Sequence, residues 1–404
     1  MNKIVFRLAS LVLFLAGSVL LLAGDPTPIP KEKIALFLDK ARIDNEIPGL
    51  QCSITNGVEL WTHVSGVSNV KRQTPLTAED RYRVGSITKT FTSMTILELI
   101  DEGRLDDWSQ KHPGVTPLTL DDSLVQWLPD LIINSSTVTV RTLLNHTAGF
   151  FDFTADAVLW TMPFTFLPDM RLTPKELVRI GTFEKTRTGT PGARWDYSST
   201  NYAILALIVE AVTGNTWEKE VEDRFLKNTE LKLTDTIVPA TANVIIPPPS
   251  AGGYVNYGTN GLSPLLKDEL VPRIISSPTF SWGVGSMISN TKDGVRWMYS
   301  IGNGKLLSPE LYKEQFTWFP ITDLFGTPVT GWGMGLGVVY VTQYEDMYVN
   351  VAGHRGQIYG SDCSIQYILN KDVAIAIYAN RTIKDSGNVD YQIMFKLVNE
   401  FFQQ

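Results

Sequence analysis

The chain has 404 residues, of which 44% are hydrophobic and 19% are charged, and its formal net charge is −7. This composition is that of a globular protein with a large core, and it excludes an intrinsically disordered chain. The acidic balance, without any basic cluster, excludes a nucleic acid as the partner.

The first 24 residues have the layout of a signal peptide. Two basic residues precede an uninterrupted apolar stretch over 8–23, and Asp25 and two prolines follow it. Leu22 stands where a cleavage site prefers a small residue, so a retained signal anchor remains an alternative. We therefore expect an exported protein, periplasmic or secreted, which an uncleaved segment would attach to a membrane.

The cysteines and histidines argue against a scaffold of disulfides or metals. Only Cys52 and Cys363 are present, too few to hold an exported protein of this size together. Both lie in strand-like stretches, and we interpret them as buried thiols rather than as a bridge. The four histidines show no spacing typical of metal ligands, so we expect no metal site.

Strand-like segments flank a helical middle region. Near the N-terminus a helix over 31–43 precedes strands over 50–56 and 58–66, and the Asn-Gly pair between the strands predicts a hairpin. Apolar residues that recur near helical spacing predict the next helix, which contains Lys89 and ends at Gly103.

The middle of the chain, from about 105 to 235, has a mostly helical pattern, and 200–214 is a nearly all-apolar helix. Residues 239–262 are rich in proline, glycine and asparagine, which is typical of a long loop. The last third returns to short, turn-separated strands and ends in an amphipathic helix.

Together these elements predict an α/β fold of the sandwich type. Strands from both ends of the chain would form one antiparallel sheet flanked by helices, with a mostly helical region inserted between them. In a single domain over 25–404, residues 25–104 and 275–404 would form the α/β part and 105–274 the helical part.

A serine and a lysine lie three residues apart where the helix after the hairpin begins. The spacing Ser-x-x-Lys occurs three times in the chain, but only Ser86 and Lys89 stand at the mouth of an apolar helix. On a helix such a pair shares one face, so the amine can reach the hydroxyl. Burial and the positive helix end both disfavour the ammonium, which makes Lys89 a proton acceptor beside a nucleophile. The alternative is a capping serine and a solvated lysine, and this stretch alone does not decide between them.

Two further stretches complete a pattern. Tyr197 directly precedes the apolar helix, where it would be either a catalytic group or a structural anchor, and His354 lies on a predicted strand in GHRGQIYG. In this order along the chain, the three motifs resemble those of the serine β-lactamase and penicillin-binding protein superfamily. The resemblance runs from about residue 31 to 400 and includes LLNHTAGF and TPGARWDYSSTNY. It is greatest to the branch of class C β-lactamases, D-Ala-D-Ala carboxypeptidases and related esterases, and it implies the β-lactamase/transpeptidase-like fold.

The resemblance implies a catalytic role for each motif. Ser86 would be the acylated nucleophile and Lys89 its activating partner, and Tyr197 would relay the proton to the leaving group. His354 stands where many relatives carry a lysine, and it would steady Tyr197 and add a positive field. If its pKa is unperturbed, activity should change near pH 6–7.

The same resemblance implies contacts to substrate around the third motif. Gly356 would let substrate approach the strand edge, and the backbone N–H of Gln357 would complete an oxyanion hole with that of Ser86. The chemistry needs no cofactor.

Two positions depart from the pattern of the relatives. Ser199 replaces the usual asparagine that holds the acyl carbonyl of the substrate, which puts penicillin-type substrates in doubt. Arg355 stands where a threonine or serine often meets the substrate carboxylate. Its guanidinium would either pair with that carboxylate or point to solvent on an edge strand.

The leading hypothesis is an exported serine hydrolase that acts through an acyl-enzyme on D-Ala-D-Ala-type peptides or related amides and esters. An esterase and then a β-lactamase of the same fold are the alternatives within the enzyme class. A catalytically silent binding or scaffold module is the alternative outside it, and only Ser199 favours it. The expected partner is a small-molecule or peptide substrate, and the sequence leaves the oligomeric state open.

Overall fold

The computed structural model describes residues 25–131, 135–155, 171–182, 189–239, 245–256, 270–272, 278–324, 327–358, 360–382 and 389–403. The predicted signal segment lies outside these residues. No helix within them is long and apolar enough to cross a membrane.

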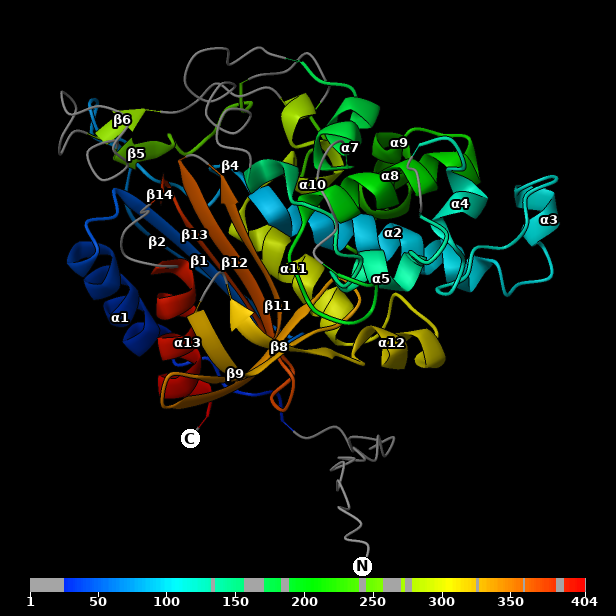
Figure 1. Ribbon diagram of the computed structural model, residues 1–404. Coiled ribbons are helices and arrows are strands. Elements are labelled where there is room, and N and C mark those ends of the chain that lie inside the picture. The colour runs from blue at the N-terminus through cyan, green and yellow to red at the C-terminus, as the bar shows by residue number, and fades with distance from the viewer. Residues whose placement is uncertain are drawn as a thin grey trace, which may run out of the picture.

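One antiparallel sheet with nine described strands forms the centre of the α/β part (Figure 1). The N-terminal hairpin pairs with a strand from the end of the chain, since Cys52 lies opposite both His63 and Ile377. This arrangement confirms the predicted fold class. In spatial order the strands are β3 (Thr74–Pro75), β2 (Leu60–Asn69), β1 (Gly49–Thr55), β13 (Val373–Ala379), β12 (Ser361–Ile368), β11 (Met347–Ile358), β10 (Val339–Tyr344), β9 (Thr327–Met334) and β8 (Phe319–Leu324).

Helices cover both faces of the sheet. α11 (Thr291–Gly302) packs on β1, β12 and β13 from one side, and α1 (Lys31–Asp44) and α13 (Val389–Phe402) cover the opposite side (Figure 1). The two faces correspond to two clusters of buried apolar side chains. Cys363 belongs to one cluster and Cys52 to the other, and both thiols are free and buried, as the sequence predicts.

The helical part lies beside the sheet, around α2 (Thr88–Glu102) and α8 (Ser199–Thr213) (Figure 1). α8 is buried along most of its length and ends at Gly214, whose φ of +70° closes the helix in the left-handed conformation. The other α-helices in the described part of the chain are α3 (Trp108–Lys111), α4 (Leu124–Trp127), α5 (Val140–Leu144), α7 (Pro174–Thr182), α9 (Trp217–Val221), α10 (Trp282–Gly285) and α12 (Pro309–Gln315).

Short strands lie above the main sheet. β5 (Tyr254–Asn256) pairs with β6 (Leu270–Pro272) and β14 (Arg381–Thr382), and β4 (Tyr82–Arg83) pairs with β7 (Ile288–Ser289). The prediction of a continuous loop over 239–262 is therefore wrong at β5, which is too short to show a strand periodicity.

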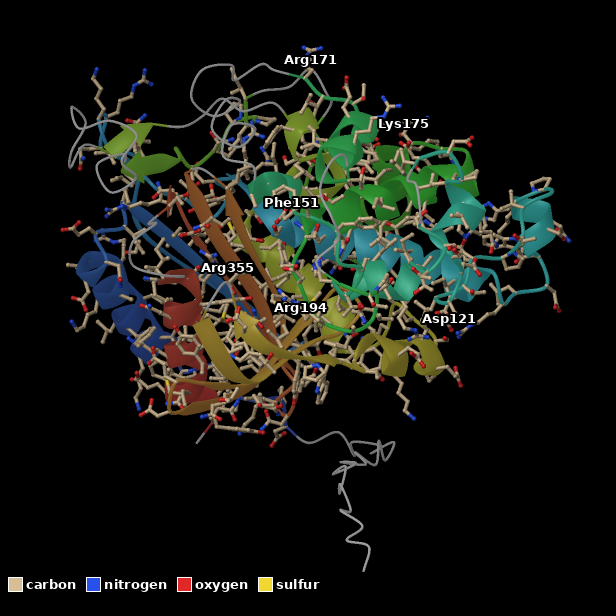
Figure 2. The ribbon with its side chains drawn as sticks, viewed as in Figure 1. Asp121, Phe151, Arg171, Lys175, Arg194 and Arg355 are labelled. Carbon is tan, nitrogen blue, oxygen red and sulfur yellow. The ribbon has the colours of Figure 1, made fainter. Side chains whose placement is uncertain are left out.

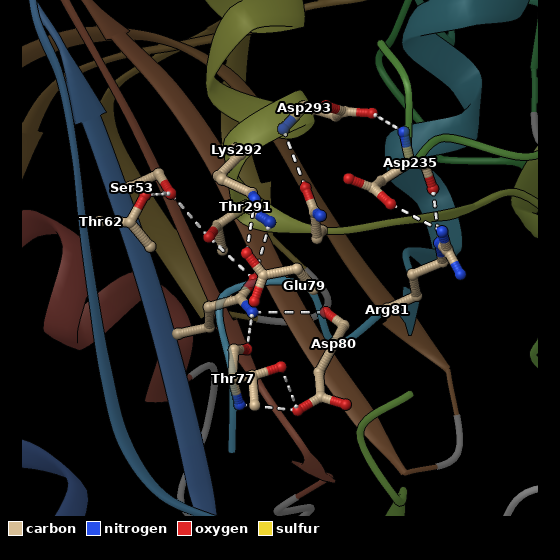
Figure 3. Close-up of polar contacts among 12 residues, drawn as sticks. Ser53, Thr62, Thr77, Glu79, Asp80, Arg81, Asp235, Thr291, Lys292 and Asp293 are labelled. Carbon is tan, nitrogen blue, oxygen red and sulfur yellow. Dashed lines mark hydrogen bonds and ion pairs between the residues drawn. The ribbon is translucent and has the colours of Figure 1, made fainter. Parts of the chain in front are cut away.

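A buried polar network fixes the segment that leads to the predicted nucleophile (Figure 3). Gln51 of β1 accepts hydrogen bonds from the N–H and hydroxyl of Thr291, at 2.8 and 2.9 Å. Its amide donates to the carbonyls of Thr77 and Asp80, at 2.8 and 3.3 Å. The network thus ties β1, the start of α11 and the turn before β4 together, and β4 runs directly into the turn that carries Ser86.

Candidate active site

A pocket of about 340 Å³ lies where the sheet meets the helical part. It brings together seven of the eight predicted site residues: Ser86, Lys89, Tyr197, Ser199, His354, Arg355 and Gln357. Gly356 is the exception.

Ser86 lies in a single 3₁₀ turn, η1 (Gly85–Ile87), immediately before α2 begins. Gly85 has a φ of +52°, and a Cβ on it would lie 2.8 Å from both the N and the O of Gln357. Only glycine allows this approach, which brings the backbone of β11 against the Ser86 turn. The backbone N–H groups of Ser86 and Gln357, which are expected to form the oxyanion hole, therefore belong to two segments in direct contact.

Lys89 is in the first turn of α2 and only 1% exposed. Its Nζ lies 2.9 Å from Ser86 Oγ and donates to the carbonyl of Val284 on α10, also at 2.9 Å. Burial lowers the pKa of Lys89 from 10.5 to about 7, against the opposing charge of Asp152. At neutral pH a large fraction of this amine has a lone pair for the Ser86 proton.

Tyr197 contacts the same hydroxyl. It forms a side-chain hydrogen bond with Ser86, and its ring centroid is 5.2 Å from Lys89 Nζ. Burial raises the pKa of Tyr197 well above its ordinary value of 10. Its hydroxyl therefore holds its proton at neutral pH and can give it to a leaving group.

His354 differs from the sequence-based expectation. Its Nδ1 donates to the carbonyl of Arg355 at 2.5 Å, and its buried Nε2 has no hydrogen-bond partner among the described residues. Burial, together with the charge of Lys89, lowers the pKa of His354 from 6.5 to about 3. The ring is therefore neutral in the range where an ordinary histidine titrates and adds no positive field there, so the condition for a midpoint near pH 6–7, an unperturbed pKa, is not met.

The expectation that Arg355 points to solvent on an edge strand is wrong. Its guanidinium bonds to Asp390 at 2.7 Å and to Asp362 at 3.1 Å, and both carboxylates are buried. The side chain is 16% exposed, and β11 lies inside the sheet between β10 and β12. The cation is thus paired with two carboxylates of the protein, which offset its attraction for a substrate carboxylate.

Gly356 serves a contact within the protein. A Cβ on it would lie 1.8 Å from the carbonyl oxygen of Val84 and 3.0 Å from the N of Ile87. The structure thus requires glycine for the close packing of β11 against the turn that holds Ser86, and the expected role in substrate approach stays a prediction.

Asp152 places in the pocket a charge that the sequence does not predict. Its Oδ1 accepts hydrogen bonds from the N–H of Ser199 at 3.2 Å and from the N–H and hydroxyl of Thr154 at 3.0 and 2.8 Å. Its charge raises the pKa of Lys89. An aspartate in a loop carries no sequence signal for this placement.

His146 is a second missed residue. Its ring is fully buried and lies 4.3 Å, centroid to centroid, from that of Tyr197. Its Nδ1 accepts the N–H of Ser198 at 3.1 Å, and burial lowers its pKa well below 6.5, so the ring is neutral. The stretch LLNHTAGF, which contains it, was part of the resemblance and could have indicated it.

The rest of the pocket is largely apolar. Its aromatic and aliphatic lining comes from the segment before α8, from β8 to β11 and from α13: Trp195, Ile321, Trp332, Val339, Ile358 and Tyr391. Within the described residues, no group of three or more histidine, cysteine or acidic side chains could hold a metal ion.

Comparison with known proteins identifies the family. The profile of the family described as Beta-lactamase matches residues 34–398. The chain belongs to the Beta-lactamase family. This confirms the superfamily indicated by the three motifs, a family of serine hydrolases, and the site described above lies within the matched range.

Solved structures share this fold over most of the chain. A D-stereospecific amidohydrolase from Streptomyces sp. is 29% identical with a TM-score of 0.75, over 92% of this chain and 99% of that one. A D-amino acid amidase from Ochrobactrum anthropi SV3, complexed with L-phenylalanine amide, is 22% identical with a TM-score of 0.74, over 90% and 96%. At that identity the second likeness concerns the fold.

Curated relatives are longer than the chain. Protein flp of Staphylococcus aureus (strain N315) is 26% identical over 281 residues, which is 66% of this chain and 47% of that protein. The unguisins hydrolase ungD' of Aspergillus campestris (strain IBT 28561) is 26% identical over 358 residues, 83% of this chain and 59% of that protein. The chain thus spans about half the length of the curated relatives that it matches.

Proposed function

We propose that the protein is an exported serine hydrolase that acts through an acyl-enzyme on peptides and amides of D-amino acids, the class to which D-Ala-D-Ala ends belong. The observation that carries the proposal is the placement of one hydroxyl, Ser86 Oγ, between a lysine with a pKa of about 7 and a protonated tyrosine. A buried lysine of this kind is a proton acceptor at neutral pH.

The reaction follows from this placement. Lys89 takes the proton of Ser86 as Oγ attacks the substrate carbonyl, and the N–H groups of Ser86 and Gln357 stabilise the developing oxyanion. Tyr197 gives its proton to the leaving amine and is reprotonated by the Lys89 ammonium. Water then attacks the acyl-enzyme, and the same groups return the proton to Ser86.

The relatives support an amide or peptide substrate. The Streptomyces structure is that of a D-stereospecific amidohydrolase, and the Aspergillus relative is called an unguisins hydrolase. An oxyanion hole and a protonated tyrosine suit the expulsion of an amine. Esters need less help from the acid, so we expect the same site to hydrolyse activated esters as well.

The charges of the pocket favour some members of this class. His354 is neutral, Arg355 is bound by two carboxylates, and Asp152 contributes a negative charge. Of the described side chains that line the pocket, Lys89 is then the only cation without an ion-pair partner, and its pKa of about 7 leaves it partly deprotonated at neutral pH. Peptides whose carboxylate directly follows the scissile bond therefore fit less well than amides do.

The test compares five substrates with the wild-type protein and the Ser86→Ala variant as the control. These are a D-amino-acid amide, its L-enantiomer, a D-Ala-D-Ala peptide, a p-nitrophenyl ester and a chromogenic cephalosporin. We expect turnover of the D-amide, at least tenfold slower turnover of the L-amide, and none in the variant. Turnover of the ester alone would indicate an esterase, turnover of the cephalosporin alone a β-lactamase, and turnover of none a silent module; each of these would contradict the proposal.

Export rests on residues 1–24. We propose that this segment directs the protein across a membrane and is either removed or kept as an anchor. The mass of the N-terminal peptide of the purified protein distinguishes the two, and recovery of full-length protein in the cytoplasm alone would contradict export.

A further inference from the structure

A second pocket, of about 900 Å³, opens from the catalytic pocket. Asp152, Ala155, Trp195 and Tyr197 line both cavities, so the two form one continuous groove. Cavities of ~300–1,000 Å³ enclose most of a drug-sized ligand. The catalytic pocket therefore has room for the scissile bond and an adjoining side chain, and the second pocket has room for a longer segment. We call this second pocket the distal groove.

Aromatic side chains from three parts of the chain form its walls. Phe150 and Phe151 follow α5, Trp195 precedes α8, and Phe319 and Pro320 begin β8. Phe150 is buried, whereas the other three aromatic side chains are partly exposed. Figure 2 shows Phe151 on the side of the helical part, across from the sheet. A lining with several aromatic rings favours an apolar occupant.

On the β8 side of the distal groove, a bound peptide cannot pair with the sheet as an additional strand. Among the described strands, β8 is the last of the sheet and pairs with β9 alone. Pro320 has no backbone N–H, and a proline on an edge strand blocks regular pairing with a further chain. Recognition in the distal groove would therefore depend on side chains rather than on main-chain hydrogen bonds.

The charged groups around the groove are mainly acidic. Among the described residues, Asp152, Asp196 and Asp323 line it, against one guanidinium, that of Arg194. Arg194 lies 3.9 Å from Asp196 and is 67% exposed, so it is paired and hydrated. An occupant that ends in a carboxylate would face this acidic lining, whereas an amide or a continuing chain would not.

The lining residues also indicate which half of a substrate lies there. Ser86 and Gln357, which would hold the acyl carbonyl, line the catalytic pocket but not the distal groove. Tyr197, which would protonate the leaving amine, lines both. The groove thus continues from the point where the leaving group departs.

We propose that the distal groove binds the leaving-group segment of a peptide substrate, at least two residues long, with an aromatic or large aliphatic side chain and no carboxylate near the scissile bond. This inference rests on the proposed function and specifies its substrate class. The enzyme would cleave within a linear or cyclic peptide rather than remove a single C-terminal residue.

The kinetic test uses three substrates with the same D-acyl residue: the simple amide, the amide extended by Phe-Leu-NH₂, and the same extension as a free acid. We expect kcat/KM to be at least tenfold higher for the extended amide than for the simple amide, and the acid to lose most of this gain. The gain lost by the acid should recover in part at high salt, because salt screens the repulsion.

Variants locate the effect. Phe319→Ala should lower kcat/KM for the extended amide at least tenfold and change that for the simple amide less than twofold. Trp318→Ala is the matched control, because this neighbouring side chain stacks on Tyr340 and does not line the groove. No gain from the extension in the wild type, or an equal loss for both substrates in Phe319→Ala, would overturn the proposal.

A binding measurement separates this inference from the proposed function. Fluorescence anisotropy of a labelled, extended peptide amide should show binding to Ser86→Ala, and Phe319→Ala in that background should weaken the affinity at least tenfold. Phe319-dependent binding without turnover by the wild type would refute the proposed function and retain the groove. Turnover of the simple amide without Phe319-dependent binding would refute the groove alone.

Discussion

The activity of the protein should rise with pH through about 7, because Lys89 must be neutral to accept the proton of Ser86. The fall of its pKa from 10.5 to about 7 corresponds to about 5 kcal/mol against the buried ammonium. An ordinary lysine would be neutral in about one molecule in 3,000 at pH 7, whereas here about half of the molecules are competent. Burial therefore contributes roughly a thousandfold to the fraction of active protein at neutral pH.

The perturbation that tests this reasoning is Asp152→Asn. The aspartate charge raises the pKa of Lys89, so its removal should move the midpoint to lower pH. Asparagine retains a side-chain oxygen for the N–H groups of Ser199 and Thr154, which makes the exchange conservative. The measurement is kcat/KM for the simple D-amide from pH 5 to 9 at constant ionic strength, since this quantity reports the pKa values of the free enzyme.

A profile that is flat over this range, or a midpoint near 10, would refute the assignment of the base to Lys89. A midpoint that moves upward in Asp152→Asn would contradict the electrostatic argument. A midpoint between 6 and 7 that disappears in His354→Gln would mean that the histidine titrates after all, against its burial beside Lys89.

Four further outcomes are expected. Lys89→Met should abolish acylation and raise the melting temperature at pH 7 by several degrees. The folded protein binds the proton of Lys89 less well than the unfolded chain does, so this lysine makes stability rise with pH between about 7 and 10.5 and costs stability at pH 7. A lower melting temperature of the variant would contradict this. In His146→Asn, the asparagine tolerates the backbone φ of +58°, but the ring that packs against the catalytic tyrosine is lost. We expect kcat to fall roughly 10–100-fold in steady-state assays while circular dichroism shows that the fold is retained. An unchanged kcat would contradict the positioning role of His146. Gly356→Ala should lower the free energy of unfolding by about 1–3 kcal/mol in urea titrations, since its Cβ meets the backbone, and wild-type stability would show that β11 can move away. Asp390→Asn should remove one of the two ion pairs of Arg355. We expect kcat/KM for substrates that end in a carboxylate to rise severalfold relative to kcat/KM for amides. An unchanged ratio would show that Asp362 alone holds the guanidinium in place.

Local signals in the sequence were sufficient to predict the main helices and strands and the order of the motifs along the chain. The Asn-Gly pair predicts the hairpin, and the apolar run at 200–214 predicts α8, because both depend on neighbours in the chain. The placement of Ser86 and Lys89 follows from helix geometry in the same way. These features need no knowledge of distant contacts.

What the sequence does not predict depends on packing between distant segments. The carbonyl of Val284, which accepts a hydrogen bond from Lys89, is 195 positions away along the chain. Arg355 finds Asp390 only because α13 covers β11, and Asp152 reaches the pocket from a loop. The neutral state of His354 likewise depends on burial, which a motif of three residues does not encode.

The central claim, that Ser86 is the nucleophile, is tested most directly by intact-mass spectrometry after incubation with a fluorophosphonate. We expect one covalent adduct on the wild-type protein, its formation accelerating with pH through about 7, and none on Ser86→Ala. An adduct that persists in the variant would place the nucleophile elsewhere, and the absence of any adduct on the wild type would contradict an activated serine in this pocket.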